Sequence, residues 1–139
     1  MDNFDLERFV SAQEGIYEGV LAQIKRGRKT GHWMWFIFPQ LRGLGHSDMS
    51  ARYALGSIEE ARVYLGDPLL GPRLRECVAA LQDITGKSAV EVFGTVDAQK
   101  LCSSLTLFAE IKTDHGIFEA ALVRWFAGRR DQRTICLLD

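Results

Sequence analysis

The sequence predicts an all-α protein, folded as a single compact domain of about six or seven helices over residues 1–139. Apolar residues recur at spacings of three and four along most of the chain, which is the period of an amphipathic helix. Residue types that begin or end helices separate these segments, and strand-like alternation is not seen outside one aromatic run. A length of 139 residues, with 47% hydrophobic and 25% charged residues, suits one domain with a core of its own.

Residues 6–26 are predicted to form one long amphipathic helix. The acidic Glu7 lies near its start and the basic Lys25 and Arg26 lie near its end, as the helix dipole favours. Gly27 is the expected stop. One stripe of this helix holds its apolar residues: Leu6, Phe9, Val10, Ile16, Tyr17, Val20, Leu21 and Ile24.

An aromatic and glycine-rich segment follows at residues 31–50. Neither the helical nor the strand period fits it, because the run is apolar on both possible faces. Two glycines, Gly43 and Gly45, interrupt any regular element after it. We expect a short buried helix or extended piece and then an irregular loop. Four aromatic residues fall within six positions: Trp33, Trp35, Phe36 and Phe38.

Two capping boxes predict further helix starts. Ser57 and Glu60 have the spacing at which a serine hydroxyl and a glutamate carboxylate satisfy each other's backbone amides, and they open a helix through position 65. Ser88 and Glu91 repeat the pattern, and a glycine closes that short helix at position 94.

Aspartates predict the remaining starts. Asp67, followed by a proline that favours the first turn, precedes a buried face at residues 74–81. Asp97 is the expected N-cap of a helix with apolar residues up to position 108. A helix over residues 117–128 is expected to end at its glycine, and Asp131 to start a last short helix.

The composition gives no general reason to expect a nucleic-acid or membrane partner. The formal net charge is −1, and the longest near-apolar run, residues 33–39, is far too short to span a bilayer. A basic run at residues 25–29 fits a solvated helix end, although such a patch also suits phosphates. Three cysteines without a paired spacing and an N-terminus unlike a signal peptide predict a cytoplasmic protein. The sequence leaves the oligomeric state open.

Several chemistries are excluded because their motifs fail. Residues 86–88 are similar to the end of a phosphate-binding P-loop, but Leu81 stands where that motif needs a glycine. The glycine pair at residues 43–45 lacks the third glycine of a dinucleotide-binding loop. We expect no metal and no cofactor, because the histidines have no paired spacing: His32, His46 and His115.

The loop after the aromatic run is the first candidate site. Aromatic rings such as Trp35 bury or stack a ligand, and a few polar groups such as Gln40 and Ser47 orient it. Arg42 has the geometry to grip a phosphate or carboxylate by two hydrogen bonds, and His46 to move a proton near neutral pH. The alternative is that the aromatic residues are core and the loop only passes over them.

The second candidate segment is the helix expected after Asp97. Helical spacing brings Lys100, Ser103 and Ser104 together, with Thr106 on another side. A serine–lysine nucleophile is conceivable here. The alternative has Asp97 as a cap, Lys100 on the surface and the hydroxyls bonded to helix carbonyls.

A set of segments and single residues spread along the chain matches the pattern of a known family: 35–47, 60–65, 68–74, 93–94, Asp97, Lys100, 103–108, Gly128, Asp131 and Thr134. On these residues the chain resembles the domain-of-unknown-function family 1810, an uncharacterised bacterial family. The resemblance runs through nearly the whole chain and implies a compact, mainly helical fold and no established activity. Members often carry the label calpastatin, but true calpastatins are long disordered inhibitors, whereas this chain has the apolar content of a globular domain.

The first functional hypothesis is a pocket for a nucleotide, ADP-ribose or sugar phosphate. A faint likeness to the helical NADAR domains, which are linked to NAD and ADP-ribose metabolism, points the same way. Arg42 and Lys100 would hold phosphate, and His46 or Asp97 would serve as acid or base if a glycosidic or phosphate-type bond is hydrolysed. The candidate ligand-binding residues are Trp35, Gln40, Arg42, His46, Ser47, Lys100 and Thr106.

The second hypothesis is a non-catalytic module that binds a protein or forms an oligomer through its aromatic surface. It predicts a contiguous exposed apolar patch, whereas the first predicts a concave pocket with charged groups inside. The sequence does not decide whether the protein is an enzyme.

Overall fold

The all-α prediction is confirmed by the computed structural model, which describes residues 4–112 and 116–138 and builds them from ten helices. In those ranges the β pairing is limited to an isolated bridge between Leu41 and Leu55, and no helix there is long and apolar enough to cross a membrane. The helices are α1 (Glu7–Gln13), α2 (Tyr17–Arg26), α3 (Met34–Ile37), α4 (Asp48–Arg52), α5 (Ile58–Gly66), α6 (Leu70–Gln82), α7 (Ala89–Phe93), α8 (Thr95–Ala109), α9 (Ile117–Phe126) and α10 (Gln132–Leu138).

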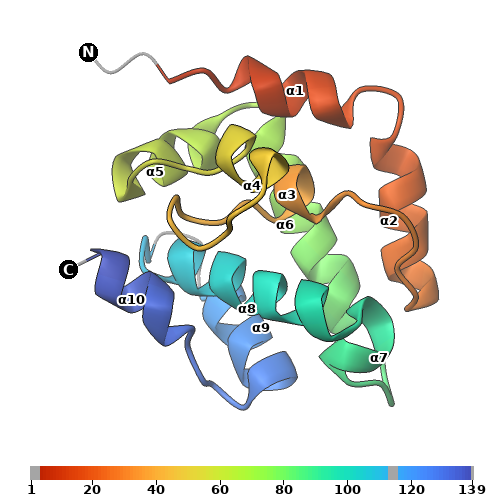
Figure 1. The fold of residues 1–139 in the computed structure, drawn as a ribbon. Coiled ribbons are helices and arrows are strands. Elements are labelled where there is room, and N and C mark those ends of the chain that lie inside the picture. Colours follow the sequence, from red (N-terminus) through yellow and green to blue (C-terminus); the bar gives the residue numbers. More distant parts are fainter. Residues whose placement is uncertain (1–3, 113–115, 139) are drawn as a thin grey trace.

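Helix α8 lies at the centre of the fold (Figure 1). Every residue from 101 to 108 is buried, and α8 packs against α3, α5, α7, α9 and α10. A helix that is covered on all sides needs apolar or internally bonded residues around its whole circumference. The exposed residues of α8 lie in its first two turns, so this helix presents its chemistry only at its start.

The prediction of one long helix over residues 6–26 is wrong. The chain breaks at Gly15, whose φ of +77° is a left-handed conformation that favours glycine. The break lets α1 pack on α3 while α2 packs on α6, and Figure 1 shows the two helices running in clearly different directions. Gln13, the last residue of α1, is buried, and its Nε2 donates to the carbonyl of Phe36 at 2.6 Å.

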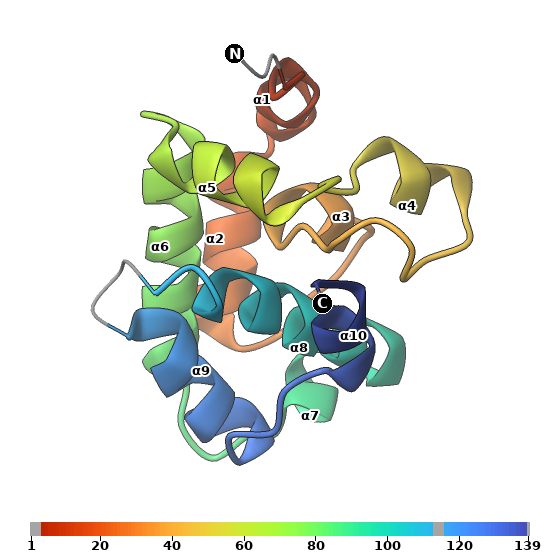
Figure 2. The ribbon, with the colours of Figure 1, turned by 90° about the vertical axis from the view of Figure 1, so that its left-hand side faces the viewer.

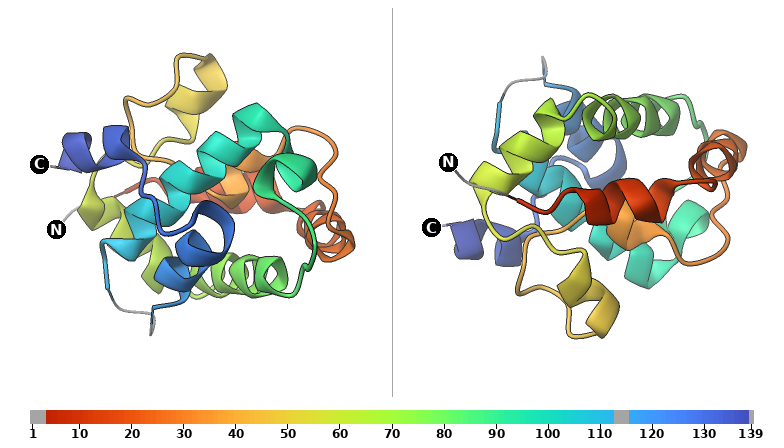
Figure 3. Two further views of the ribbon diagram at one scale, coloured as in Figure 1. Left: turned by 90° about the horizontal axis from the view of Figure 1, so that it is seen from below. Right: turned by 90° about the horizontal axis from the view of Figure 1, so that it is seen from above.

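The aromatic run forms a short buried helix and then a loop, as expected. Trp33, Phe36 and Phe38 are buried, and Phe38 packs edge-on against Phe93 at 6.4 Å. The loop that follows is not wholly irregular, because residues 48–52 form α4, and this helix accounts for part of the higher helix number. Helix α4 stands out from the body of the molecule (Figures 2 and 3).

Both predicted serine caps are present, but only one belongs to a complete capping box. Ser88 Oγ accepts from the amide of Glu91 at 3.1 Å, and the Glu91 carboxylate accepts from the amide of Ser88 at 2.8 Å. Ser57 Oγ accepts from the amide of Glu60 at 3.2 Å. Glu60, however, accepts from the amide of Gly56 at 2.7 Å, so the reciprocal bond expected at residue 57 is replaced by one a residue earlier.

The aspartates predicted as caps differ in outcome. Asp67 accepts from two amides at the start of α6, and Asp131 accepts from the amide of Thr134 at 3.1 Å at the start of α10. The prediction for Asp97 is wrong, because α8 begins two residues before it, after Gly94 with its φ of +83°. The Asp97 carboxylate therefore makes other contacts.

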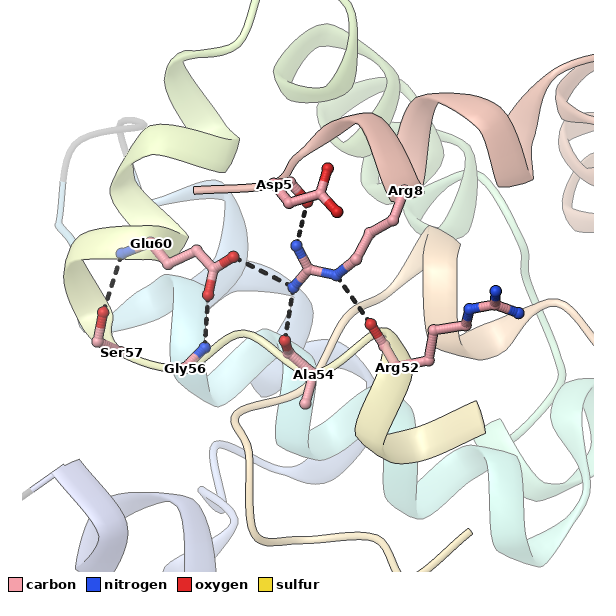
Figure 4. A network of polar contacts seen from close by, with 7 residues as sticks. All are labelled: Asp5, Arg8, Arg52, Ala54, Gly56, Ser57 and Glu60. Atoms are coloured by element: carbon pink, nitrogen blue, oxygen red, sulfur yellow. Dashed lines mark hydrogen bonds and ion pairs between the residues drawn. The ribbon is translucent and has the colours of Figure 1, made fainter. Parts of the chain in front are cut away.

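An arginine ties α1 to the segment between α4 and α5 (Figure 4). Arg8 Nε donates to the carbonyl of Arg52 and Nη2 to that of Ala54, both at 2.8 Å. Nη1 donates to the carbonyl of Asp5, and Nη2 forms an ion pair with Glu60 Oε2 at 3.1 Å. These bonds hold the end of the α4 loop against the body of the protein.

Candidate functional site

Three cavities that share lining residues lie where the loop of residues 40–45 meets the start of α8, and Trp35 lines two of them. The loop cavity, of about 210 Å³, lies between this loop and α4. The central cavity, of about 420 Å³, lies between the loop, α8 and α10. The lysine cavity, of about 410 Å³, lies between residues 29–35 and the start of α8. Trp35 lines the first and third, Gln40 the first and second, and Lys100 the second and third. Together they form the Trp35 site.

Trp35 is a wall of this site rather than a residue of the core. Helix α3 has four residues, and Met34, Phe36 and Ile37 are buried in the core. Trp35 points to a different side of this short helix and is only partly buried. Its Nε1 atom is buried and has no hydrogen-bond partner among residues 4–112 and 116–138. The ammonium of Lys100 lies 4.4 Å from the centre of the Trp35 ring, a cation–π contact.

Two lysines share one carboxylate at the lysine cavity. Asp97 Oδ2 lies 2.7 Å from Lys29 Nζ, and Asp97 Oδ1 lies 3.5 Å from Lys100 Nζ. The side chain of Lys29 is only 5% exposed, and its ammonium also lies 5.0 Å from the centre of the Trp33 ring. Two cations against one carboxylate leave a surplus positive charge beside apolar walls.

A buried carboxylate lies at the central cavity. Asp131 accepts from Gln99 Nε2 at 3.0 Å, from Ser103 Oγ at 3.0 Å and from the amide and hydroxyl of Thr134. These bonds join α10 to α8 and explain how a buried carboxylate is accommodated there. Ser103 Oγ also lies 3.1 Å from the carbonyl oxygen of Gln99, so the Ser103 hydroxyl contacts both the backbone of its own helix and the carboxylate that caps α10.

The structure brings five of the candidate ligand-binding and acid–base residues to the Trp35 site, and Ser103 of the second candidate segment lines the central cavity. Trp35, Gln40 and Arg42 line the loop cavity, and Asp97 and Lys100 line the lysine cavity. The Arg42 side chain is exposed, and its guanidinium lies beside Gly56, where an added Cβ would be 3.3 Å from Nη1. Arg42 therefore stands at the outer edge of the site.

Three other predicted residues are not brought to these cavities. Thr106 is fully buried, where its hydroxyl donates to the carbonyl of Cys102 at 2.8 Å and accepts from the amide of Asp131 at 2.9 Å. Ser47 caps α4 through the amide of Ser50 at 3.0 Å. His46 is exposed and does not line any of the three cavities.

Sequence reasoning missed Lys29, Asp131 and Arg133 as residues of the site. Lys29 belongs to the basic run interpreted as a solvated helix end, although its position directly before the aromatic run was a usable signal. Asp131 was expected only as a cap. Arg133, whose Nη2 donates to the carbonyl of Leu44 at 3.2 Å, gave no signal in its local sequence. Of the three histidines, His115 lies outside the described residues, and residues 4–112 and 116–138 hold no metal-ligating cluster.

The fold and the site define an all-α protein with adjoining surface cavities that are lined by tryptophan and charged side chains. The chain belongs to the family described as "Protein of unknown function (DUF1810)", whose model matches residues 3–138. A crystal structure of the conserved hypothetical protein Rv1873 from Mycobacterium tuberculosis is similar to it, with a TM-score of 0.95, 51% sequence identity and coverage of 99% of this chain and 98% of that one. No curated protein matches the chain.

Proposed function

We propose that the Trp35 site binds a small molecule that carries phosphate, with a nucleotide, ADP-ribose or a sugar phosphate as the candidate classes. The observation that carries this proposal is a local excess of cations in a chain whose formal net charge is −1. Phosphate binding relies on such an excess inside a concave site with apolar walls. The three cavities are lined by four cations and two carboxylates: Lys29, Arg42, Lys100, Arg133, Asp97 and Asp131.

The arrangement suits a ligand with both a flat and an anionic part. The partly exposed Trp35 ring offers an apolar face, and Gln40, between the loop and central cavities, supplies an amide that both donates and accepts. Arg42 lines the loop cavity together with Trp35, and Lys100 lines the lysine cavity together with the same ring. The proposal is one of binding; the hydrolytic roles considered for His46 and Asp97 gain no support, because His46 lies outside the cavities and Asp97 is shared between two ammonium groups.

The alternative of an interaction module gains less support from the described surface. Its expected signature is a contiguous apolar patch. The large exposed apolar side chains instead lie on several different elements: Ile16, Met49, Val63, Leu69, Val90, Val96, Val123 and Leu137.

A ligand panel tests the proposal. AMP, ADP, ADP-ribose, NAD and ribose 5-phosphate are added to the purified protein, with adenosine and ribose as phosphate-free partners, and melting temperature and binding heat are measured. A ligand at a hundred times its Kd stabilises the fold by about 2.7 kcal/mol, which is about 10 °C for a domain of this size. We expect a shift from at least one phosphate compound and none from its phosphate-free partner.

Matched arginine variants locate the response. Arg42→Ala is expected to weaken the binding, whereas Arg26→Ala, which removes an exposed arginine of α2 outside the three cavities, leaves it unchanged. A panel without any shift in the wild-type protein contradicts the proposal and favours the interaction module.

A further inference from the structure

We propose that the phosphate subsite of the Trp35 site is formed by the ammonium groups of Lys29 and Lys100, and that Asp97 is an internal counter-ion which an incoming phosphate displaces from Lys100. This inference rests on the proposed function and specifies which end of the site takes the phosphate. It assigns to Asp97 a role in tuning affinity that neither a cap nor a general base would have.

Lys100 has donors that the protein itself does not use. Its side chain is 20% exposed, yet among residues 4–112 and 116–138 its ammonium makes no hydrogen bond. Its neighbours are Asp97 Oδ1 at 3.5 Å and the face of Trp35 at 4.4 Å. An ammonium donates three hydrogen bonds, so Lys100 can donate to phosphate oxygens at the cost of its ion pair with Asp97 and of no hydrogen bond within the described ranges.

Lys29 supplies a second, fixed charge. Its nearly buried ammonium donates to the carbonyl of Gly31 and pairs with Asp97 Oδ2 at 2.7 Å, and its backbone amide donates to the carbonyl of Val92 at 2.9 Å. A cation held in this way among apolar walls is screened by solvent less than one on the open surface. Asp97 neutralises one of the two lysines, and the surplus charge faces the cavity.

The start of α8 strengthens the potential of the two lysines. Gly94 precedes this fifteen-residue helix and offers no side-chain cap, so the first amides rely on other acceptors. Thr95 and Val96, the first two residues of α8, line both the central and the lysine cavities. The helix dipole adds positive potential at this end. The negative charge of Asp97, in the first turn of α8, offsets part of that potential as long as no phosphate is bound.

Arg42 is the weaker candidate for the phosphate. It is exposed at the edge of the smaller loop cavity. A Cβ placed on Gly56 would lie 3.3 Å from Arg42 Nη1 and 3.4 Å from Glu60 Oε1, so the guanidinium lies near a carboxylate. Its field is therefore reduced by solvent and by that carboxylate. A phosphate monoester or pyrophosphate carries more charge than the Asp97 carboxylate and offers more acceptor oxygens, which lets it compete for Lys100.

Inorganic pyrophosphate is the probe for this subsite. It is titrated into ¹⁵N-labelled protein at constant ionic strength, set with KCl, and the amide and indole signals are followed by NMR. We expect the shifts to centre on residues 94–100 and on the Trp35 indole. Lys100→Gln should weaken the fitted Kd about tenfold or more, and Asp97→Asn should tighten it about tenfold, because one charge-assisted bond is lost or one competing charge is removed.

Charge-matched variants exclude a general electrostatic effect. Lys25→Gln and Asp83→Asn make the same charge changes at exposed positions outside the three cavities and should leave the Kd within about twofold. Lys100→Arg, which retains the charge, should bind better than Lys100→Gln. The unperturbed remainder of each amide spectrum shows that the variant is folded.

The possible failures are distinguishable. If pyrophosphate shifts residues 41–45 and responds to Arg42→Gln but not to Lys100→Gln, a phosphate site exists and the assignment to the lysines is overturned. Weaker binding by Asp97→Asn overturns the counter-ion role. If neither pyrophosphate nor the nucleotide panel binds, both this inference and the proposed function are overturned.

Discussion

Removal of the Asp131 carboxylate should unfold the protein at markedly lower denaturant concentration. The carboxylate caps α10 through the amide of Thr134, and it accepts from Gln99 and Ser103 of α8. A lost cap costs about 1 kcal/mol. Each hydrogen bond to a charged group contributes roughly 1.5–3 kcal/mol, and donors left buried without a partner add to the loss. Because such terms are not additive, we expect Asp131→Ala to lower the free energy of unfolding by about 3 kcal/mol.

Urea unfolding followed by circular dichroism measures this change. A loss of that size lowers the urea midpoint by about 1.5 M, if the slope is about 2 kcal/mol/M. Asp131→Asn keeps one acceptor oxygen but turns an NH₂ group toward one of the donors, so it should fall between the wild type and Asp131→Ala. Asp83→Ala, at an exposed aspartate after α6, is the control and should change the midpoint little. A loss below about 1 kcal/mol for Asp131→Ala would refute the claim that this carboxylate joins α10 to α8.

Two further predictions concern the backbone and the thiols. Gly15→Ala should lower the free energy of unfolding by about 1 kcal/mol, because φ at this position is +77°. Gly19→Ala, within α2, should instead raise it by up to about 1 kcal/mol. Equal effects of the two variants in thermal unfolding would contradict the break between α1 and α2. Burial raises the pKa of the Cys77 thiol to about 12 and also raises the pKa of Cys102, whereas Cys136 is exposed. A thiol reagent at pH 8 should therefore modify one thiol of the native protein, Cys136, and all three thiols in denaturant. Fast modification of Cys77 in the native protein would be inconsistent with its burial.

The fold class follows from the sequence because periodicity and end signals are local properties. The starts of α7 and α10 were predicted at Ser88 and Asp131, where a side chain satisfies an amide three residues on. The start of α8 was misplaced because Asp97 is a common cap type, whereas the true start follows Gly94, which both ends α7 and precedes α8. Because Gly94 takes part in both helix ends, the local sequence gives only a weak signal for the start of α8.

The break at Gly15 shows where periodicity fails. The apolar stripe continues through it with correct spacing, so the stripe alone does not reveal that the chain turns. A signal was present in Gln13, a polar residue placed close to that stripe, which the structure buries against the carbonyl of Phe36. A buried amide needs a partner from elsewhere in the fold, and such a partner is not visible in local sequence.

The same limit applies to the site. Trp35, Gln40 and Arg42 were predicted together because an aromatic run beside a polar, glycine-rich loop is itself a local pattern. Arg133 reaches the central cavity only because α10 packs on α8, and it lies 89 residues from the carbonyl it bonds. Chain-distant side chains of this kind come from tertiary packing, and the sequence offered no spacing from which to infer them.

Hydrogen-bonding partners divide the cations near the loop into two groups with different roles. Arg8 donates to carbonyls of residues 52 and 54, and Arg133 donates to the carbonyl of Leu44, so these two arginines hold the two ends of the segment that carries α4. Among residues 4–112 and 116–138, the side chains of Arg42 and Lys100 make no such hydrogen bond. Arg8 donates four hydrogen bonds from its five N–H groups and so has little left for a ligand, whereas Arg42 and Lys100 retain their donors. The shape of the Trp35 site and its capacity to bind an anion therefore depend on different residues, and variants can change one without the other.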